Sequence, residues 1–154
     1  MATQIGALHV RRSIFIEATP KRVWQEFTSF ERIKAWFGLG HTLHALDPTE
    51  GAVADLSVEI DGQRRHFGGA VLSVDPAREL TIASNWQGAE AWPTPTYWTI
   101  RLTALYGGTL VELFHHGFER LGGDAGDNLE GYEQGWDVKH LVALRRIVLG
   151  KSVG

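Results

Sequence analysis

The spacing of apolar residues changes along this chain, and that change constrains the fold more than any other feature. From about residue 45 to residue 118 apolar and polar residues alternate, which is the pattern of half-buried strands. Over 127–149 the apolar residues recur at helical spacing instead. A chain of 154 residues has the length of one domain. The sequence therefore predicts a single α+β domain, residues 1–154, in which an antiparallel sheet precedes a long C-terminal helix.

Six strands are expected, one before the alternating region and five within it. Asp61-Gly62 and Gly107-Gly108 are signals for tight turns, and strands joined by such turns pair antiparallel. The predicted strands are Val10–Ala18, Ala52–Asp61, Gln63–Val74, Glu79–Trp86, Tyr97–Tyr106 and Thr109–His116.

Two short helices are expected directly after the first strand. Thr19-Pro20 provides a cap and a first helical residue for one of them. Thr28, three residues before a Glu, provides a capping box for the other, which Gly38 ends. A curved sheet that takes the long helix on its concave face, with the short helices closing one end, buries all the apolar faces. Because a twisted sheet rarely contacts a helix along its whole length, we expect a cavity between them.

Four segments, in order along the chain, resemble one family. The segments are RSIFIEATPKRVWQEFTSFERIKAWFG (12–38), GGAVLSVDPARE (68–79), GTLVELFHHGF (108–118) and GWDVKHLVAL (135–144). They resemble the Bet v 1-like/START (SRPBCC) superfamily, in the branch named for the activator of Hsp90 ATPase. The resemblance implies a helix-grip (Bet v 1-like) fold, with a curved antiparallel sheet wrapped around a long C-terminal helix and two short helices after the first strand.

Composition argues against several classes of function. A net charge of −3 and a pI near 6.1 lack the basic footprint of a nucleic-acid partner. The absence of Cys rules out a thiolate nucleophile, a disulfide framework and a thiolate metal site. No apolar run is long enough to cross a membrane, and the N-terminus lacks the pattern of a signal peptide. We therefore predict a cytoplasmic protein with no membrane association.

The aromatic residues suggest what the expected cavity would bind. Small-molecule sites are mostly apolar and aromatic with a few polar groups. The chain has six Trp, and three of them fall on the expected cavity face, although ordinary core filling explains any single Trp as well. Trp24 and Trp36 are expected to anchor the short helices, and the loop 87–96 is interpreted as a hairpin connection rather than a lid. The predicted ligand-binding residues are Leu56, Val58, Trp86, Trp98, Ile100, Leu113, His115, Trp136 and His140.

The seven His do not show the spacing of a metal site. His115 and His116 are neighbours on a strand and so point to opposite faces. A site built from His66, His115 and His140 would need the fold to bring them together. No nucleophile motif such as Gly-x-Ser-x-Gly occurs. We therefore predict no metal, no cofactor and no catalytic residue.

The leading functional prediction is the binding of a small apolar or aromatic ligand, without catalysis. One alternative is an enzyme of cyclase or hydratase type that uses His140 as acid or base, which a second titratable group beside His140 would favour. The other is a protein-partner module, either stress-related and co-chaperone-like or a homodimer. That module would use the helix face around Gly135, Val138 and Val142. The resemblance leaves these open, because one fold hosts many functions.

Overall fold

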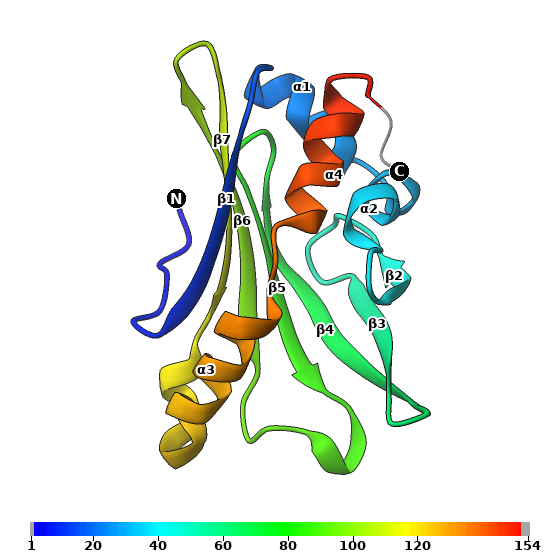
Figure 1. Cartoon of the computed structure of the whole chain (residues 1–154), viewed down its shortest axis with the longest axis vertical. Coiled ribbons are helices and arrows are strands. Elements are labelled where there is room, and N and C mark those ends of the chain that lie inside the picture. Colours follow the sequence, from blue (N-terminus) through cyan, green and yellow to red (C-terminus); the bar gives the residue numbers. More distant parts are fainter. Residues whose placement is uncertain (1, 152–154) are drawn as a thin grey trace.

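One antiparallel sheet is the framework of the molecule. The computed structural model describes residues 2–151, and within them seven strands pair in the order β1-β7-β6-β5-β4-β3-β2. Figure 1 shows the helices gathered on one side of this sheet. The strands are β1 (His9–Ile16), β2 (Thr42–Leu46), β3 (Val53–Ile60), β4 (Gln63–Asp75), β5 (Glu79–Trp86), β6 (Thr96–Leu105) and β7 (Gly108–His116). The helices are α1 (Pro20–Trp24), η1 (Gln25–Phe27), α2 (Phe30–Phe37), η2 (Gly88–Glu90), η3 (Phe118–Asp124), α3 (Ala125–Gly135) and α4 (Lys139–Val148).

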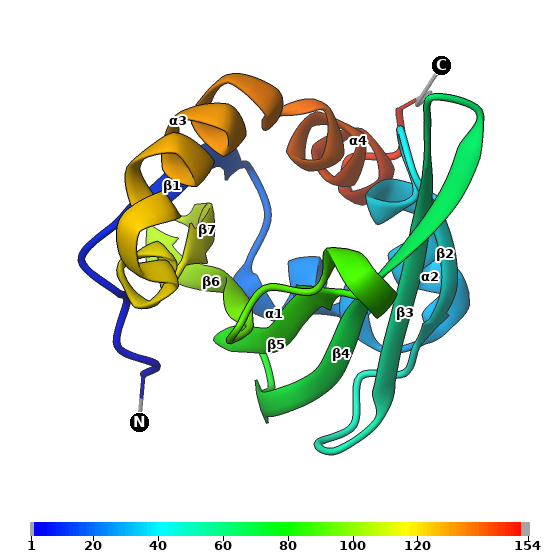
Figure 2. The ribbon, with the colours of Figure 1, turned by 90° about the horizontal axis from the view of Figure 1, so that it is seen from below.

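The sheet curves around the helices. In the view of Figure 2 the strands form an open curve, and α3 and α4 close its open side. The predicted α+β helix-grip arrangement is therefore confirmed. The six predicted strands are all present, and their ends shift by two residues at most.

Strand β2 was not predicted. It is five residues long, and a bulge between Leu43 and Ala45 interrupts its pairing with β3. Its two buried residues, Leu43 and Leu46, therefore lie three positions apart rather than two. The bulge removes the alternation by which a strand is recognised in sequence.

Side-chain caps begin the two short helices. Thr19 Oγ1 accepts a hydrogen bond from the amide of Arg22 at 3.2 Å, as predicted. The second cap lies one residue later than predicted, because Ser29 accepts the bond from the amide of Arg32. The Thr28 hydroxyl instead donates to a backbone carbonyl of the preceding turn.

The C-terminal helical region is divided, where one helix over 127–149 was predicted. Trp136 has an extended backbone between α3 and α4. Arg12 of β1 ends α3 by donating to the carbonyls of Glu133 at 2.5 Å and Trp136 at 3.2 Å. A helix C-terminus leaves such carbonyls without intrahelical partners, so this guanidinium stabilises the break. Asp137 Oδ1 then accepts a backbone amide of the first turn of α4 at 2.5 Å.

The main core lies where α1, α2 and α4 meet the sheet. Trp24 and Trp36 are both buried in it, as predicted, and stabilise the short helices. The Trp36 indole donates to the Glu26 carbonyl at 2.9 Å, so this large side chain is buried without an unpaired polar atom. Leu144 of α4 is completely buried in the same cluster. This end of the concave face is therefore filled.

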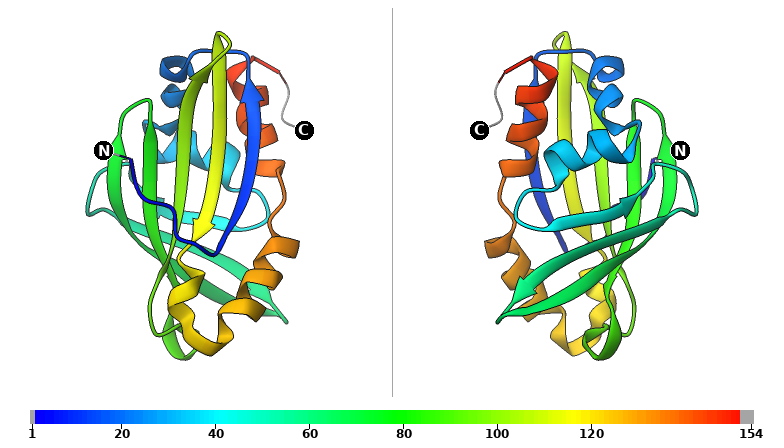
Figure 3. Two further views of the ribbon diagram at one scale, coloured as in Figure 1. Left: turned by 90° about the vertical axis from the view of Figure 1, so that its left-hand side faces the viewer. Right: turned by 90° about the vertical axis from the view of Figure 1, so that its right-hand side faces the viewer.

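The convex face of the sheet is covered in part by the N-terminal segment, residues 2–8, which lies across it in Figure 3. The amide of Thr3 donates to Glu79 Oε2 at 2.8 Å, and that of Gly6 donates to His116 Nδ1 at 3.1 Å. His116 thus faces outward while His115 faces the concave side, as the strand pattern predicted.

Among the described helices, all are too short or too polar to cross a lipid bilayer.

Candidate functional site

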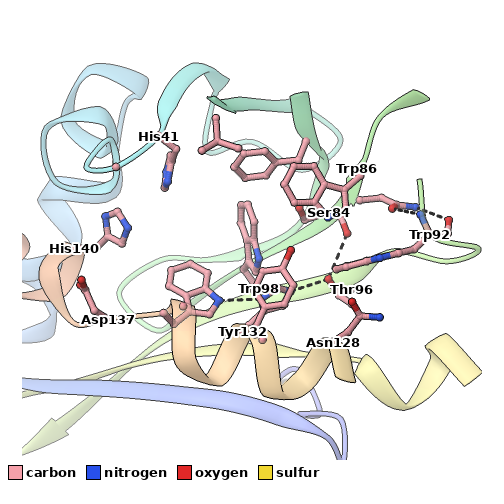
Figure 4. A pocket seen from close by; sticks show the side chains of 18 of the residues that line it. His41, Ser84, Trp86, Trp92, Thr96, Trp98, Asn128, Tyr132, Asp137 and His140 are labelled. Carbon is pink, nitrogen blue, oxygen red and sulfur yellow. Dashed lines mark hydrogen bonds between the residues drawn. The ribbon is translucent and has the colours of Figure 1, made fainter. Parts of the chain in front are cut away.

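A cavity of about 400 Å³ lies between the sheet and α3. Strands β3 to β7 supply one wall, α3 and the start of α4 supply the other, and the loop between α2 and β2 closes one end (Figure 4). Small-molecule sites have volumes of about 300–1,000 Å³, so the size fits a small organic ligand. The residues that line the cavity are Leu39, Gly40, His41, Val58, Phe67, Ser84, Asn85, Trp86, Trp92, Thr96, Trp98, His115, Asp127, Asn128, Gly131, Tyr132, Gly135, Trp136, Asp137, Lys139 and His140.

The structure brings six of the nine predicted ligand-binding residues together around this cavity. Leu56, Ile100 and Leu113 are not among its walls: each is at most 2% exposed and packs in the main core, which corrects their placement at the site. Alternation shows which face of a strand a residue occupies, but not where along the strand a helix covers that face. The six at the walls are Val58, Trp86, Trp98, His115, Trp136 and His140.

Two aromatic side chains near α3 were missed as site residues. Tyr132 lies one helical turn before Trp136, so helical spacing already placed both on one stripe. Trp92 belongs to the loop 87–96, which was interpreted as a plain connection. Its ring packs edge-on against Tyr132 with 5.9 Å between centroids, and it lines the cavity. The spacing of α3 held the signal for the first, whereas a loop residue has no such signal.

Phe67 and His41 also line the cavity, and neither was predicted as a site residue. Phe67 pairs with Trp86 across β4 and β5, and their ring centroids lie 5.2 Å apart. The register of the hairpin would have found Phe67, because directly paired residues share a face. His41 follows a glycine in the loop before β2 and has no periodic signal in the sequence.

His115 is the centre of a satisfied hydrogen-bond chain. The Trp136 indole N–H donates to His115 Nδ1 at 2.9 Å, so the ring proton must lie on Nε2. Nε2–H then donates to Thr96 Oγ1 at 2.8 Å, and that hydroxyl donates to the Ser84 carbonyl. Burial lowers the pKa of His115 to about 3, with a smaller contribution from His116. His115 is therefore neutral near pH 7 and positions Trp136.

A second bond links α3 to the sheet. The hydroxyl of Tyr132 is hydrogen-bonded by the Trp86 side chain, and an indole N–H can only donate. Burial raises the pKa of Tyr132 to about 12, so the hydroxyl stays protonated. Together with the Trp136–His115 bond, this contact holds α3 over the cavity.

His41 and His140 lie at the end of the cavity nearest α2. His140 Nδ1 lies 3.3 Å from the carbonyl oxygen of Trp36, and since a carbonyl only accepts, Nδ1 carries the proton. His41 hydrogen-bonds the backbone of Phe37, and its buried Nε2 has no partner within residues 2–151. Its proton therefore also lies on Nδ1. Each ring keeps a lone pair on Nε2.

The two rings are close and uncharged. Their centroids lie 5.2 Å apart with 44° between the planes, and Figure 4 shows both at the same end of the cavity. Burial, with a smaller contribution from the neighbouring His140, lowers the pKa of His41 to about 4; burial also lowers the pKa of His140. Asp137 and Lys139 stand at the exposed rim. The interior thus has a neutral polar end and aromatic walls.

Trp98 adds a buried donor without an acceptor to these walls: it is 4% exposed, and its indole N–H meets no acceptor in the described part of the chain. The indoles of Trp36, Trp86 and Trp136 all have partners. Burying a donor without an acceptor costs about 1–3 kcal/mol of stability. The wall at Trp98 therefore offers a buried N–H that no described residue uses.

The histidines do not converge on a metal ion. His66 bonds Asp55 at 2.9 Å on the convex side of β3 and β4, away from His115 and His140. Across residues 2–151 no group of three or more His, Cys, Asp or Glu is placed to hold a metal.

A curved antiparallel sheet closed by C-terminal helices over a cavity is the helix-grip fold of the Bet v 1-like superfamily. Within that class, the sequence profile described as Activator of Hsp90 ATPase homolog 1-like protein matches residues 17–148. The chain belongs to this family. A search of curated proteins found no match.

Solved structures of the same fold come from several bacteria. Protein CV1439 from Chromobacterium violaceum is 20% identical, with a TM-score of 0.65 over 92% of this chain and 96% of its own. The Aha1 dimer from Colwellia psychrerythraea is 18% identical, with a TM-score of 0.62 over 94% and 98%. DynU16, from the dynemicin biosynthetic locus, is 22% identical with a TM-score of 0.65, and the match covers 95% of this chain but 49% of DynU16. At these identities the likeness shows the fold alone.

Proposed function

We propose that this protein binds a small, uncharged, apolar or aromatic molecule in the cavity between the sheet and α3, without changing it chemically. One observation carries the proposal: a cavity of about 400 Å³ has aromatic walls and neutral histidines in its interior, while its charged lining residues, Asp127, Asp137 and Lys139, are exposed. A charged ligand would lose its hydration there without gaining a counter-charge.

The walls favour a flat ligand. Trp98 contacts Trp136 at 6.3 Å and Phe67 at 5.9 Å between centroids, both nearly perpendicular. Rings arranged in this way present faces and edges to one space, and an aromatic guest gains edge-to-face contacts from each. The volume also limits the guest to a small molecule.

Binding is tested by isothermal titration calorimetry, with tryptophan emission as a second readout. Naphthalene, a sterol and a fatty acid represent three ligand classes, and we expect naphthalene to bind. Val58→Phe fills the cavity and should weaken binding by about tenfold or more, which is about 1.4 kcal/mol. Ile60→Phe lies two residues along the same strand, outside the cavity walls, and is the matched control. Failure of all three classes to bind would refute the proposal.

The enzyme alternative has one observation in its favour, the position of His41 beside His140 in the cavity. A general base works best with a pKa near the working pH, however, and burial lowers the pKa of both rings. Their neutral lone pairs suit hydrogen bonding better than proton abstraction. Exchange of the acidic C–H of an aryl methyl ketone in D₂O, lost in His140→Ala with the fold intact, would favour the enzyme instead.

Self-association is a separate proposal. The Colwellia psychrerythraea neighbour is a dimer, and here Val138 at the junction of α3 and α4 is 42% exposed. We propose a homodimer contact at the face of Gly135, Val138 and Val142. Sedimentation at high concentration should show a dimer that Val138→Glu dissociates, and a monomer at all concentrations would count against it.

A further inference from the structure

The His41–His140 end of the cavity presents hydrogen-bond acceptors of fixed orientation. Both Nδ1–H groups bind carbonyls of the last two residues of α2, Trp36 and Phe37. A helix C-terminus leaves such carbonyls without intrahelical donors, so turning either ring to expose its N–H would strand a carbonyl. The end of α2 therefore keeps both Nε2 atoms as acceptors.

The acceptor on His41 is buried and unused by the protein. Its Nε2 has no hydrogen-bond partner among residues 2–151, and the His140 ring 5.2 Å away carries a second Nε2 lone pair rather than a donor. Two neighbouring acceptors cannot satisfy each other. A ligand that brings an O–H or N–H to this point recovers the free energy of an unpaired buried group, about 1–3 kcal/mol.

Trp98, which also lines this cavity, has a hydrogen-bond donor that is free among the described residues, where His41 has a free acceptor. Its unpartnered indole N–H needs an acceptor, and its ring packs edge-on against Phe37 at 5.8 Å. His41 packs edge-on against the same Phe37 ring at 5.4 Å. A free acceptor and a free donor thus belong to side chains around one phenyl ring. A ligand group that both donates and accepts fits this region better than one that does either alone.

Other polar groups fit less well. A carboxylate or a phenolate has only acceptor atoms, which would face the lone pairs of His41 and His140. Protonating either ring to receive the anion is opposed by its burial. A ketone or an ether likewise has no hydrogen to donate. A neutral hydroxyl has both one donor and two lone pairs.

We propose that the ligand of this cavity is an uncharged hydroxylated aromatic molecule, whose O–H donates to Nε2 of His41 and whose ring lies against Trp98 and Phe67. The inference rests on the proposed binding function and narrows it from apolar or aromatic molecules to phenols.

Three matched probes test the proposal by isothermal titration calorimetry at pH 7. β-Naphthol carries the hydroxyl, its methyl ether keeps the oxygen without the hydrogen, and naphthalene lacks both. We expect β-naphthol to bind about tenfold more tightly than the ether, the size of one net hydrogen bond. His41→Phe should abolish most of that ratio while naphthalene binding persists. His66→Phe, on the convex face, should leave the ratio unchanged.

The outcomes separate this inference from the function on which it rests. Equal affinities for the three probes would overturn the phenol proposal and leave aromatic binding standing. No affinity for any of them would overturn both. A preference for β-naphthol that survives His41→Phe, with the variant folded by circular dichroism, would also overturn the assignment to His41. The ratio measured on the unaltered protein decides the case if that variant does not fold.

Discussion

The two C-terminal helices lie on the same sheet but are held to it by different forces. α4 is attached by apolar burial, whereas α3 has one buried residue, Ala125, along its described length. A small apolar cluster under α3, built on Val10, Phe118 and Leu121, is supplemented by polar contacts: Trp136 to His115, Trp86 to Tyr132, and Arg12 to the carbonyls at its end. The cavity lies under α3. The buried residues of α4 are His140, Leu141, Ala143, Leu144 and Val148.

This contrast shows how one fold combines a packed core with a cavity. The packed helix supplies stability, since burial of apolar side chains is the dominant favourable term in folding. Helix α3 leaves room for the cavity because several small and polar residues of this helix face it, among them Asn128, Gly131 and Gly135. Gly131 and Gly135 are both at the cavity wall, and an added Cβ would meet no atom within 4 Å at either.

The largest expected effect of a single substitution compares one leucine on each helix. Leu144 of α4 is fully buried, and Leu144→Ala should lower the free energy of unfolding by about 3 kcal/mol, from lost burial and the space left behind. Leu129 of α3 is only partly buried, so Leu129→Ala should cost less than half as much. Urea unfolding measures both. Equal losses would break the distinction between the two helices.

The second effect is a loss of stability in acid, which acts through the contact of α3 with His115. The pKa of His115 is about 3 in the folded protein against an ordinary value of 6.5. Between those values the unfolded chain binds a proton that the folded chain does not. The free energy of unfolding should therefore fall by about 1.4 kcal/mol for each pH unit below 6.5, with a similar slope from His41 down to about pH 4. Above pH 6.5 the contribution is complete.

Urea unfolding at pH 7, 6 and 5 measures this slope. His115→Phe removes one titrating group, so its stability should change less with pH by about 1.4 kcal/mol per unit. His9→Phe replaces a histidine whose side-chain hydrogen bond is exposed, and it serves as the control. The change of its stability with pH should equal that of the unaltered protein. A His115→Phe slope equal to that of the unaltered protein would show that His115 is not buried in its neutral form.

The smallest expected changes in stability come from two substitutions, one in each helix, that should act in opposite directions. Gly131→Ala should stabilise α3 by about 1 kcal/mol, because Ala is the better helix former and its methyl meets open space. Ala143→Gly in α4 should destabilise by at least as much, because Ala143 is 3% exposed and its methyl packs in the core. Each shift should change Tm by about 2–4 °C, in opposite directions, in calorimetric scans. A loss of stability in Gly131→Ala would mean that α3 is more tightly packed than its contacts indicate.

Local patterns in the sequence determined the sheet, its antiparallel pairing, the Thr19 cap and the burial of Trp24 and Trp36. These follow from properties of residues a few positions apart, such as the pleat of a strand or the free amides of a helix start. The same reasoning placed Trp98 and His115 on the concave face, because alternation determines the face of a strand.

Only the tertiary structure decided where the concave face is filled and where it is hollow. The break after α3 depends on Arg12, which reaches carbonyls more than 120 residues later in the chain. The position of His41 beside His140 depends on the loop after α2 meeting α4, and no periodicity in the sequence predicts such a contact. Leu56 and Val58 share one face of β3, yet helices cover the first and a cavity adjoins the second. Residue spacing along a strand predicts the face to which a side chain points. How deeply that side chain is buried depends on which segments from elsewhere in the chain pack against that face.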